Sequence, residues 1–323
     1  MRASGTDAAS GTEVKPRART TIRLAEGAEA ASLLAAEGSV WVAAYEEGGG
    51  KLFRIDPTTS EVVATIALEA VPAWEVGGRG MAAGAGAVWV TGGAEEAILQ
   101  RIDPASNKVV AAIPLGGRWG ADVAVDDKGV WVSIFGLGGR VSVVRVDPVT
   151  KRVVVTIPVE GDWLREIFTL DGTVLVRSLV GKRGTLTEAV LTVIDPTGNR
   201  VVASRRMDEA LGPLAAWDGF VLAGSGRKLV RIDPRTGRPL GEPLPVRKGV
   251  SSTSLVPDEG GIWFLGYDPD DERVPATVDR LDAEAGKIDV SVDPPESPIA
   301  MAIAYRSIWL LNYEGSLTRI ELR

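Results

Sequence analysis

The tetrapeptide Arg-Ile-Asp-Pro occurs three times in this chain, at residues 54–57, 101–104 and 231–234. Variants of it stand at residues 145–148, 193–196, 280–283 and 319–321. The acids of these seven segments follow one another at intervals of about 44 residues on average, the length of a repeat unit of four strands. A fixed period of this size indicates a chain built from repeated supersecondary units.

A second motif follows the same period. A tryptophan preceded by Val or Ile stands ahead of five of the segments, at Trp41, Trp89, Trp131, Trp263 and Trp309. Leu175 and Val221 hold the equivalent place in the other two repeats. Because these tryptophans recur at one register, we expect them to fill the core between packed sheets. The repeated Asp-Pro pairs are typical of turns, where Asp caps the backbone and Pro presets φ.

Each repeat contains four stretches with strand character, separated by turn residues, and none has a helical period. Seven such repeats predict an all-β fold, a seven-bladed β-propeller of four-stranded antiparallel blades. The last repeat ends without a fourth strand, whereas residues 20–24 resemble the fourth strand at residues 64–68. We therefore expect the N-terminal strand to complete the last blade and close the ring. Residues 1–18 are expected to form a disordered leader or linker, and residues 19–323 the propeller.

The composition excludes several kinds of chemistry. The chain has no cysteine and no histidine, so disulfides, thiolate sites, His-based triads and His metal ligands are absent. The net charge of −7 argues against nucleic acid as a partner. No apolar run is long enough to predict a membrane span. We expect no cofactor, although the carboxylates of residues 268–272 leave a weak Ca²⁺ or Mg²⁺ site open.

The Val-Trp-Val, Arg-Ile-Asp-Pro-x-Thr and Val-Val-x-Thr-Ile patterns resemble those of the YVTN-type propellers, which are relatives of the NHL-repeat and streptogramin B lyase propellers. The resemblance spans about residues 19–323 and implies a seven-bladed propeller. Members of these families serve as binding platforms, cell-surface proteins or occasional enzymes. Resemblance to the streptogramin B lyases implies a Mg-assisted elimination that uses a His, and this chain has none.

Three further tryptophans depart from the repeat. Each stands between the fourth strand of one repeat and the first strand of the next, at Trp74, Trp119 and Trp163. In a propeller these connections share one face, so the three indoles are predicted to line one rim, or else to cover blade junctions. Nearby charged residues complete the candidate binding surface: Arg79, Arg118, Arg165, Glu75 and Glu166. Trp combined with Arg is typical of binding sites.

These observations favour a non-enzymatic binding module, expected to be monomeric, that takes a small molecule, a glycan or a peptide. One alternative is a lyase or hydrolase in which Glu75 and Glu166 act as acid and base beside a divalent ion. Another is an exported structural or interaction domain. The compartment follows from what precedes these residues: extracytoplasmic if a signal or anchor was removed, and cytoplasmic otherwise.

Overall fold

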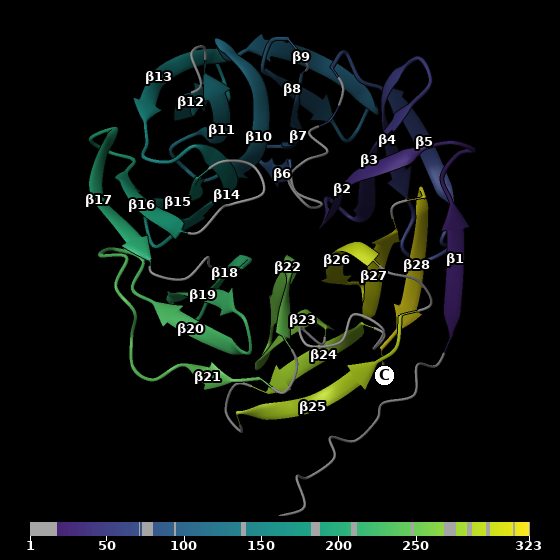
Figure 1. Cartoon of the computed structure of the whole chain (residues 1–323). Coiled ribbons are helices and arrows are strands. Elements are labelled where there is room, and N and C mark those ends of the chain that lie inside the picture. Colours follow the sequence, from purple (N-terminus) through teal and green to yellow (C-terminus); the bar gives the residue numbers. More distant parts are fainter. Residues whose placement is uncertain are drawn as a thin grey trace, which may run out of the picture.

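Seven four-stranded antiparallel sheets surround a central axis in the computed structural model, which confirms the predicted seven-bladed propeller (Figure 1). The structure describes residues 18–70, 72, 80–93, 95–136, 140–181, 188–207, 212–246, 249–267, 276–282, 286–294, 298–312 and 314–322. The side chains of residues 165, 249–253 and 267 are not described. Within these ranges, no helix is long and apolar enough to cross a membrane.

In blades 1 to 6 the chain runs as a meander from the axis outward, through strands A, B, C and D. Blade 1 comprises β2 (Glu29–Ala36), β3 (Ser39–Glu46), β4 (Gly49–Ile55) and β5 (Val62–Ala67). Blade 2 comprises β6 (Met81–Gly84), β7 (Ala87–Gly92), β8 (Ile98–Asp103) and β9 (Lys108–Pro114). Blade 3 comprises β10 (Gly117–Val125), β11 (Val130–Gly136), β12 (Val141–Asp147) and β13 (Arg152–Pro158).

The remaining blades follow the same order. Blade 4 comprises β14 (Trp163–Leu170), β15 (Thr173–Val180), β16 (Glu188–Asp195) and β17 (Arg200–Met207). Blade 5 comprises β18 (Leu214–Trp217), β19 (Phe220–Ser225), β20 (Lys228–Ile232) and the short β21 (Leu244–Pro245). Blade 6 comprises β22 (Gly249–Asp258), β23 (Gly261–Tyr267), β24 (Thr277–Asp282) and β25 (Lys287–Val292). Blade 7 comprises β26 (Pro298–Ala304), β27 (Ser307–Asn312), β28 (Ser316–Glu321) and β1 (Arg19–Arg23).

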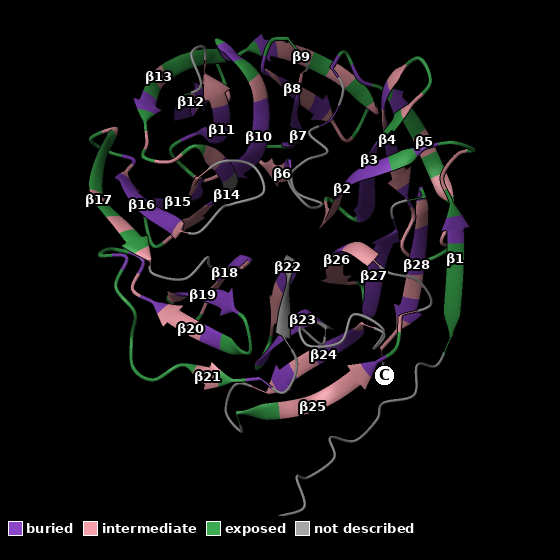
Figure 2. Ribbon diagram, viewed as in Figure 1, coloured by how far each residue is buried: buried purple, intermediate pink, exposed green. Residues whose placement is uncertain are grey.

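The hydrophobic core lies between the blades. Seven clusters of buried apolar residues each combine side chains of two adjacent blades. Side chains alternate along strand B, so that Trp131 packs toward blade 4 whereas Val130 and Val132 pack toward blade 2. The five repeat tryptophans are at most 2% exposed, which agrees with their predicted core role. Figure 2 shows this burial in the middle strands and the more exposed outer strands.

The repeated Asp-Pro pairs cap turns between strands C and D, as predicted. The Asp56 carboxylate accepts hydrogen bonds from the amides of Thr58 and Thr59, at 2.7 and 3.1 Å. The Asp147 carboxylate accepts two equivalent bonds, each 2.8 Å long. These turns and the A–B turns lie on one face of the ring, here called the bottom face. The B–C and D–A connections lie on the opposite, top face.

The arginine of the repeat motif joins neighbouring blades. Arg145 lies over its own Trp131, with the guanidinium carbon 5.3 Å from the ring centroid. The same guanidinium donates to the Pro196 carbonyl oxygen and to Asn199 Oδ1 in the next Asp-Pro turn, at 3.1 and 2.8 Å. Equivalent bonds lead from Arg54 to the turn of blade 2 and from Arg319 to the turn of blade 1.

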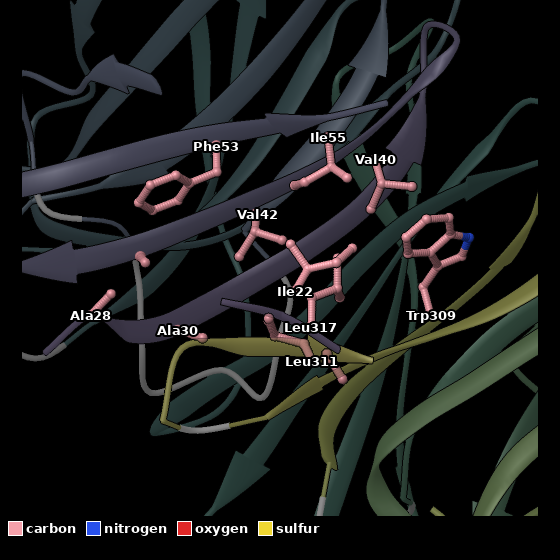
Figure 3. Close-up of a cluster of buried hydrophobic side chains, with 12 residues drawn as sticks. Ile22, Ala28, Ala30, Val40, Val42, Phe53, Ile55, Trp309, Leu311 and Leu317 are labelled. Atoms are coloured by element: carbon pink, nitrogen blue, oxygen red, sulfur yellow. The ribbon is translucent and has the colours of Figure 1, made fainter. Parts of the chain in front are cut away.

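The N-terminal strand closes the ring. β1 pairs antiparallel with β28 over its whole length, from Arg19 opposite Ile320 to Arg23 opposite Ser316. Ile22 of β1 is buried in the cluster between blades 7 and 1, together with Trp309 and Leu317 (Figure 3). The fourth strand of blade 7 therefore comes from the start of the chain, and the edge of β28 is covered.

Candidate functional site

Of the three tryptophans between a fourth strand and the next first strand, two stand at the start of innermost strands at the top face. Trp119 is the third residue of β10, and Trp163 is the first residue of β14. Both pair with strand B of their own blade, opposite Phe135 and Leu179 respectively, so they belong to strands and not to the expected loops. Trp74, together with Glu75 and Arg79, lies outside the described residues.

Two glycines allow the start of β10 to pack closely against its neighbours. A Cβ atom on Gly117 would lie 2.7 Å from the Phe135 carbonyl oxygen, and one on Gly120 would lie 1.9 Å from Thr91 Oγ1. The register shifts between Gly117 and Trp119, which makes Arg118 the extra residue of a β-bulge. Bulges redirect side chains next to binding sites, and Arg118 is exposed here.

Three aromatic rings form a row across the junction of blades 3 and 4. The Trp119 and Phe135 ring centroids are 5.4 Å apart with the planes tilted by 47°, and those of Phe135 and Trp163 are 5.5 Å apart at 63°. All three side chains are half-buried. Phe135 packs against the cluster between blades 3 and 4, and Trp163 against the one between blades 4 and 5. We call Trp119, Phe135 and Trp163 the aromatic row.

Trp119 is the member of the row that the core holds least. It is not among the apolar residues that pack against the seven described clusters. Its indole contacts the Phe135 ring and the Arg118 guanidinium, whose carbon lies 5.6 Å from the indole centroid. An indole that is half-exposed and held mainly by a cation and one ring is available for a further contact.

Glu166 lies below the rim and is not exposed on it. Its residue is 2% exposed, and its Oε2 atom accepts a hydrogen bond from Arg177 Nε at 2.9 Å. The carboxylate also accepts from the Leu214 amide of blade 5, at 3.1 and 3.2 Å. Through the bond from Leu214, Glu166 connects blade 4 with blade 5. Removing either member of the Glu166–Arg177 pair would leave an uncompensated buried charge, so the role of this pair is structural. The neighbouring Arg165 is the extra residue of the bulge in β14, and its side chain is not described.

A second buried carboxylate, Asp122, connects three blades beneath the aromatic row. Asp122 is 3% exposed. Its Oδ1 atom accepts from the amides of Gly80 in blade 2 and Val123 in its own blade, and its Oδ2 atom accepts from Ile167 in blade 4. Asp122 thereby positions the innermost strands that carry Trp119 and Trp163 relative to each other.

Sequence reasoning missed Phe135 of the row and Arg140 near it. Phe135 stands at the top end of strand B, four residues after Trp131 and on the same side of the strand; that spacing was the available signal. Arg140, an exposed residue, accepts through its carbonyl oxygen a hydrogen bond from the Gly136 amide, 2.6 Å long. Arg140 therefore lies opposite Gly136, the residue after Phe135, on the side of β11 that faces β12.

The described residues hold no group of three or more acidic side chains that could bind a metal ion. The acidic segment 268–272, where a weak Ca²⁺ or Mg²⁺ site was left open, lies outside them.

The comparisons with known proteins show a likeness of fold. No protein-family model and no curated protein sequence matches the chain. Among solved structures, it is similar to the WD40 domain of Pan2 from Neurospora crassa, with a TM-score of 0.68, 9% identity, and coverage of 95% of this chain and 96% of that one. It is also similar to hydrazine synthase of Kuenenia stuttgartiensis, with a TM-score of 0.66, 13% identity, and coverage of 88% of this chain and 92% of that one. A third similar structure is the WD40 propeller domain of Doa1, with a TM-score of 0.64, 11% identity, and coverage of 94% of this chain and 96% of that one. At identities this low, the likeness to these structures shows only that the chain shares their propeller fold.

Proposed function

We propose that this chain is a non-enzymatic protein-interaction module that binds a peptide segment of its partner on the aromatic row. The observation that carries the proposal is the row itself, in which half-buried rings from two blades meet at 5.4 and 5.5 Å beside an exposed arginine. Propellers with WD40-like architecture support a role in protein interaction. The repeat pattern further supports a place among the YVTN-type and NHL-like propellers.

A peptide suits this surface better than a glycan does. The planes of neighbouring rings are inclined by 47° and 63°, so the row offers a stepped apolar surface and no extended flat platform for a sugar ring. Stepped aromatic surfaces with an adjacent guanidinium favour side chains that insert between the rings. The alternative of a lyase or hydrolase needs both Glu75 and Glu166 at the rim, whereas Glu166 is buried and paired with Arg177.

Selection from a displayed library of random peptides on the immobilised chain tests the proposal. Selected peptides are measured again on two variants, Trp119→Ala and Tyr305→Ala. Tyr305 is the matched control because it is a partly exposed aromatic residue, 39% exposed, on the bottom face. We expect Trp119→Ala to lower the affinity by about 2 kcal/mol or more, roughly thirtyfold, and Tyr305→Ala to leave it unchanged. Peptides that bind the folded Trp119→Ala variant as tightly as the parent would contradict the proposal.

A further inference from the structure

We infer that the partner segment carries carboxylates next to an apolar or aromatic side chain. This inference rests on the proposed function and names the chemistry of the segment. It starts from Arg118, which lies beside the aromatic row on a bulge and is exposed. Within the described part of the chain, its guanidinium lies over the Trp119 ring, and no carboxylate pairs with it. A guanidinium that is held in place and lacks an acidic partner is preorganised to bind an anion from outside.

A second cation supports the same chemistry. Arg140 is exposed just before β12, and no described side chain forms an ion pair with it. Its backbone pairs with Gly136, the residue after Phe135, so Arg140 lies close in the sheet to the end of strand B that carries Phe135. An apolar side chain placed on the rings would have an acid of the same peptide within reach of Arg118.

The carboxylates of this sector are already engaged. Glu160 binds Arg206, with 2.6 Å between its Oε1 atom and Arg206 Nη2. Asp162 accepts a hydrogen bond from the Gly181 amide at 2.9 Å. Glu188 also pairs with Arg206, and Glu166 pairs with the buried Arg177. Asp162 keeps its charge, and two glutamates share Arg206. The positive charge that the row offers to a partner is therefore the Arg118 guanidinium beside Trp119, in a protein whose net charge is −7.

The negative total charge limits how far this local field extends. At physiological ionic strength charges more than about 8 Å apart are largely screened, so a peptide on Trp119 senses mainly the charges close to it, Arg118 first among them. The ion pairs it forms are partly exposed and should weaken as salt increases. The structure thus predicts binding that depends on both the rings and the salt concentration.

Three fluorescein-labelled peptides of equal length test the inference by fluorescence anisotropy. Each carries a central Trp-Leu pair, flanked by Asp in the first, by Ser in the second and by Lys in the third. They are titrated with the full chain and with three variants, Arg118→Gln, Trp119→Ala and Arg152→Gln. Arg152 is the matched control because it is an exposed arginine on the outer strand β13, away from the row.

We expect the Asp-flanked probe to bind the parent roughly tenfold more tightly than the Ser-flanked probe, and the Lys-flanked probe to bind most weakly. Arg118→Gln should remove most of that advantage and reduce the salt dependence between about 50 and 300 mM, whereas Arg152→Gln should change neither. Trp119→Ala should weaken binding of every probe that binds the parent.

The failure of the inference and the failure of the proposed function give different results. If the three probes bind alike, or if Arg118→Gln has no effect, while Trp119→Ala still abolishes binding, the acidic chemistry is wrong and the site stands. If the Asp-flanked probe does not bind the parent at millimolar concentration, the inference is also overturned. If the probes bind the folded Trp119→Ala variant as tightly as the parent, both the inference and the proposed site are overturned.

Discussion

At the scale of single residues, the nine tryptophans of the chain fall into groups with different environments. Trp131 is fully buried between blades 3 and 4, and its indole N–H donates to Asp126 Oδ1 at 3.1 Å. Trp119 is half-buried at the top face. The buried tryptophans therefore stabilise the packing between blades, whereas a half-buried tryptophan is available to contact a partner.

This separation predicts unequal costs of truncation. Trp131→Ala should lower the free energy of unfolding by about 3–5 kcal/mol through lost burial and a cavity. Trp119→Ala should lower it by about 1 kcal/mol, because it loses one ring pair and one exposed cation contact. Urea denaturation of the two variants measures both values. A larger loss for Trp119→Ala than for Trp131→Ala would contradict the division.

The repeat arginine should matter more than an exposed arginine nearby. Arg145→Gln loses the contact with Trp131 and the hydrogen bonds to the Asp-Pro turn of blade 4, so we expect a loss of about 2 kcal/mol. Arg152→Gln serves as the control and should change the free energy of unfolding by less than about 0.5 kcal/mol. Equal urea midpoints for the two variants would show that Arg145 does not link the blades.

The capped turns predict how stability depends on pH. Backbone N–H bonds, from Thr58 to Asp56 and from Thr150 to Asp147, are the main cause that lowers the pKa of each carboxyl in the folded protein. A lowered pKa contributes stability that is present above the unfolded value of about 3.9 and is lost as pH falls through the folded pKa. Because the chain has no histidine, stability should be nearly constant between about pH 5 and 8.

Urea midpoints measured from about pH 2 to pH 8 should therefore fall only below about pH 4. The double variant Asp56→Asn and Asp147→Asn keeps a side-chain oxygen that can cap each turn but cannot ionise. It should show a smaller acid-induced fall than the parent. An identical acid profile for parent and variant would argue against this origin of the pH dependence.

Some residue roles were predictable from the sequence and others were not. The roles of the Asp-Pro acids and of the repeat tryptophans follow from turn chemistry and from their common register, both of which are local. The acceptors of Arg145 in blade 4 lie more than 50 positions away in the sequence, so no local pattern reveals them. Glu166 was expected at the rim because of its neighbours, but the strand bulge after Leu164 and the Arg177 ion pair place it inside.

At the scale of strands, the outer edges of the first four blades share a bulge. The extra residue of strand D stands opposite the first two residues of the repeat motif, and it is an exposed valine in each case: Val63, Val110, Val154 and Val202. A bulge interrupts the regular row of backbone donors and acceptors that another chain would need for pairing. These valines are therefore exposed, but the bulge beside them hinders another chain from pairing with the outer strand and aggregating.

The closing strand predicts the outcome of two truncations. Removing residues 1–17 leaves β1 intact and should hardly change the melting temperature. Removing residues 1–25 deletes β1, exposes the edge of β28 and uncovers the cluster around Ile22, so the melting temperature should fall strongly and aggregation should increase. Equal melting temperatures for the two truncated proteins, measured by circular dichroism, would contradict closure by β1.

Strand order and number were predictable because the repeat occurs seven times, but strand boundaries at the top face were not. Trp119 comes two residues after a Gly-Gly pair and Trp163 directly after Gly-Asp, which are typical of loops, and yet each tryptophan pairs with strand B. The glycines at positions 117 and 120 serve close packing between strands and not a turn. Blade 5 departs furthest from the repeat, with Val221 at the tryptophan position and a fourth strand of two residues.

At the scale of the whole molecule, seven similar junctions hold the ring while one top-face sector differs from the rest. The aromatic row lies at the junction of blades 3 and 4, and beneath it Asp122 joins blades 2, 3 and 4. The architecture provides a rigid support, and the departures from the repeat provide the surface that a partner recognises. The sequence indicated this sector through its extra tryptophans, whereas the packing that unites it required the fold.

Hydrogen–deuterium exchange of the chain, with and without a peptide selected on it, tests most directly where the partner binds. We predict slower exchange in the presence of the peptide for segments that cover residues 115–121 and 159–166, at the start of β10 and around the start of β14. The Asp-Pro turns of the bottom face should exchange at unchanged rates. Protection confined to the bottom-face turns, with none at the starts of β10 and β14, would contradict the assignment of the binding surface to the aromatic row.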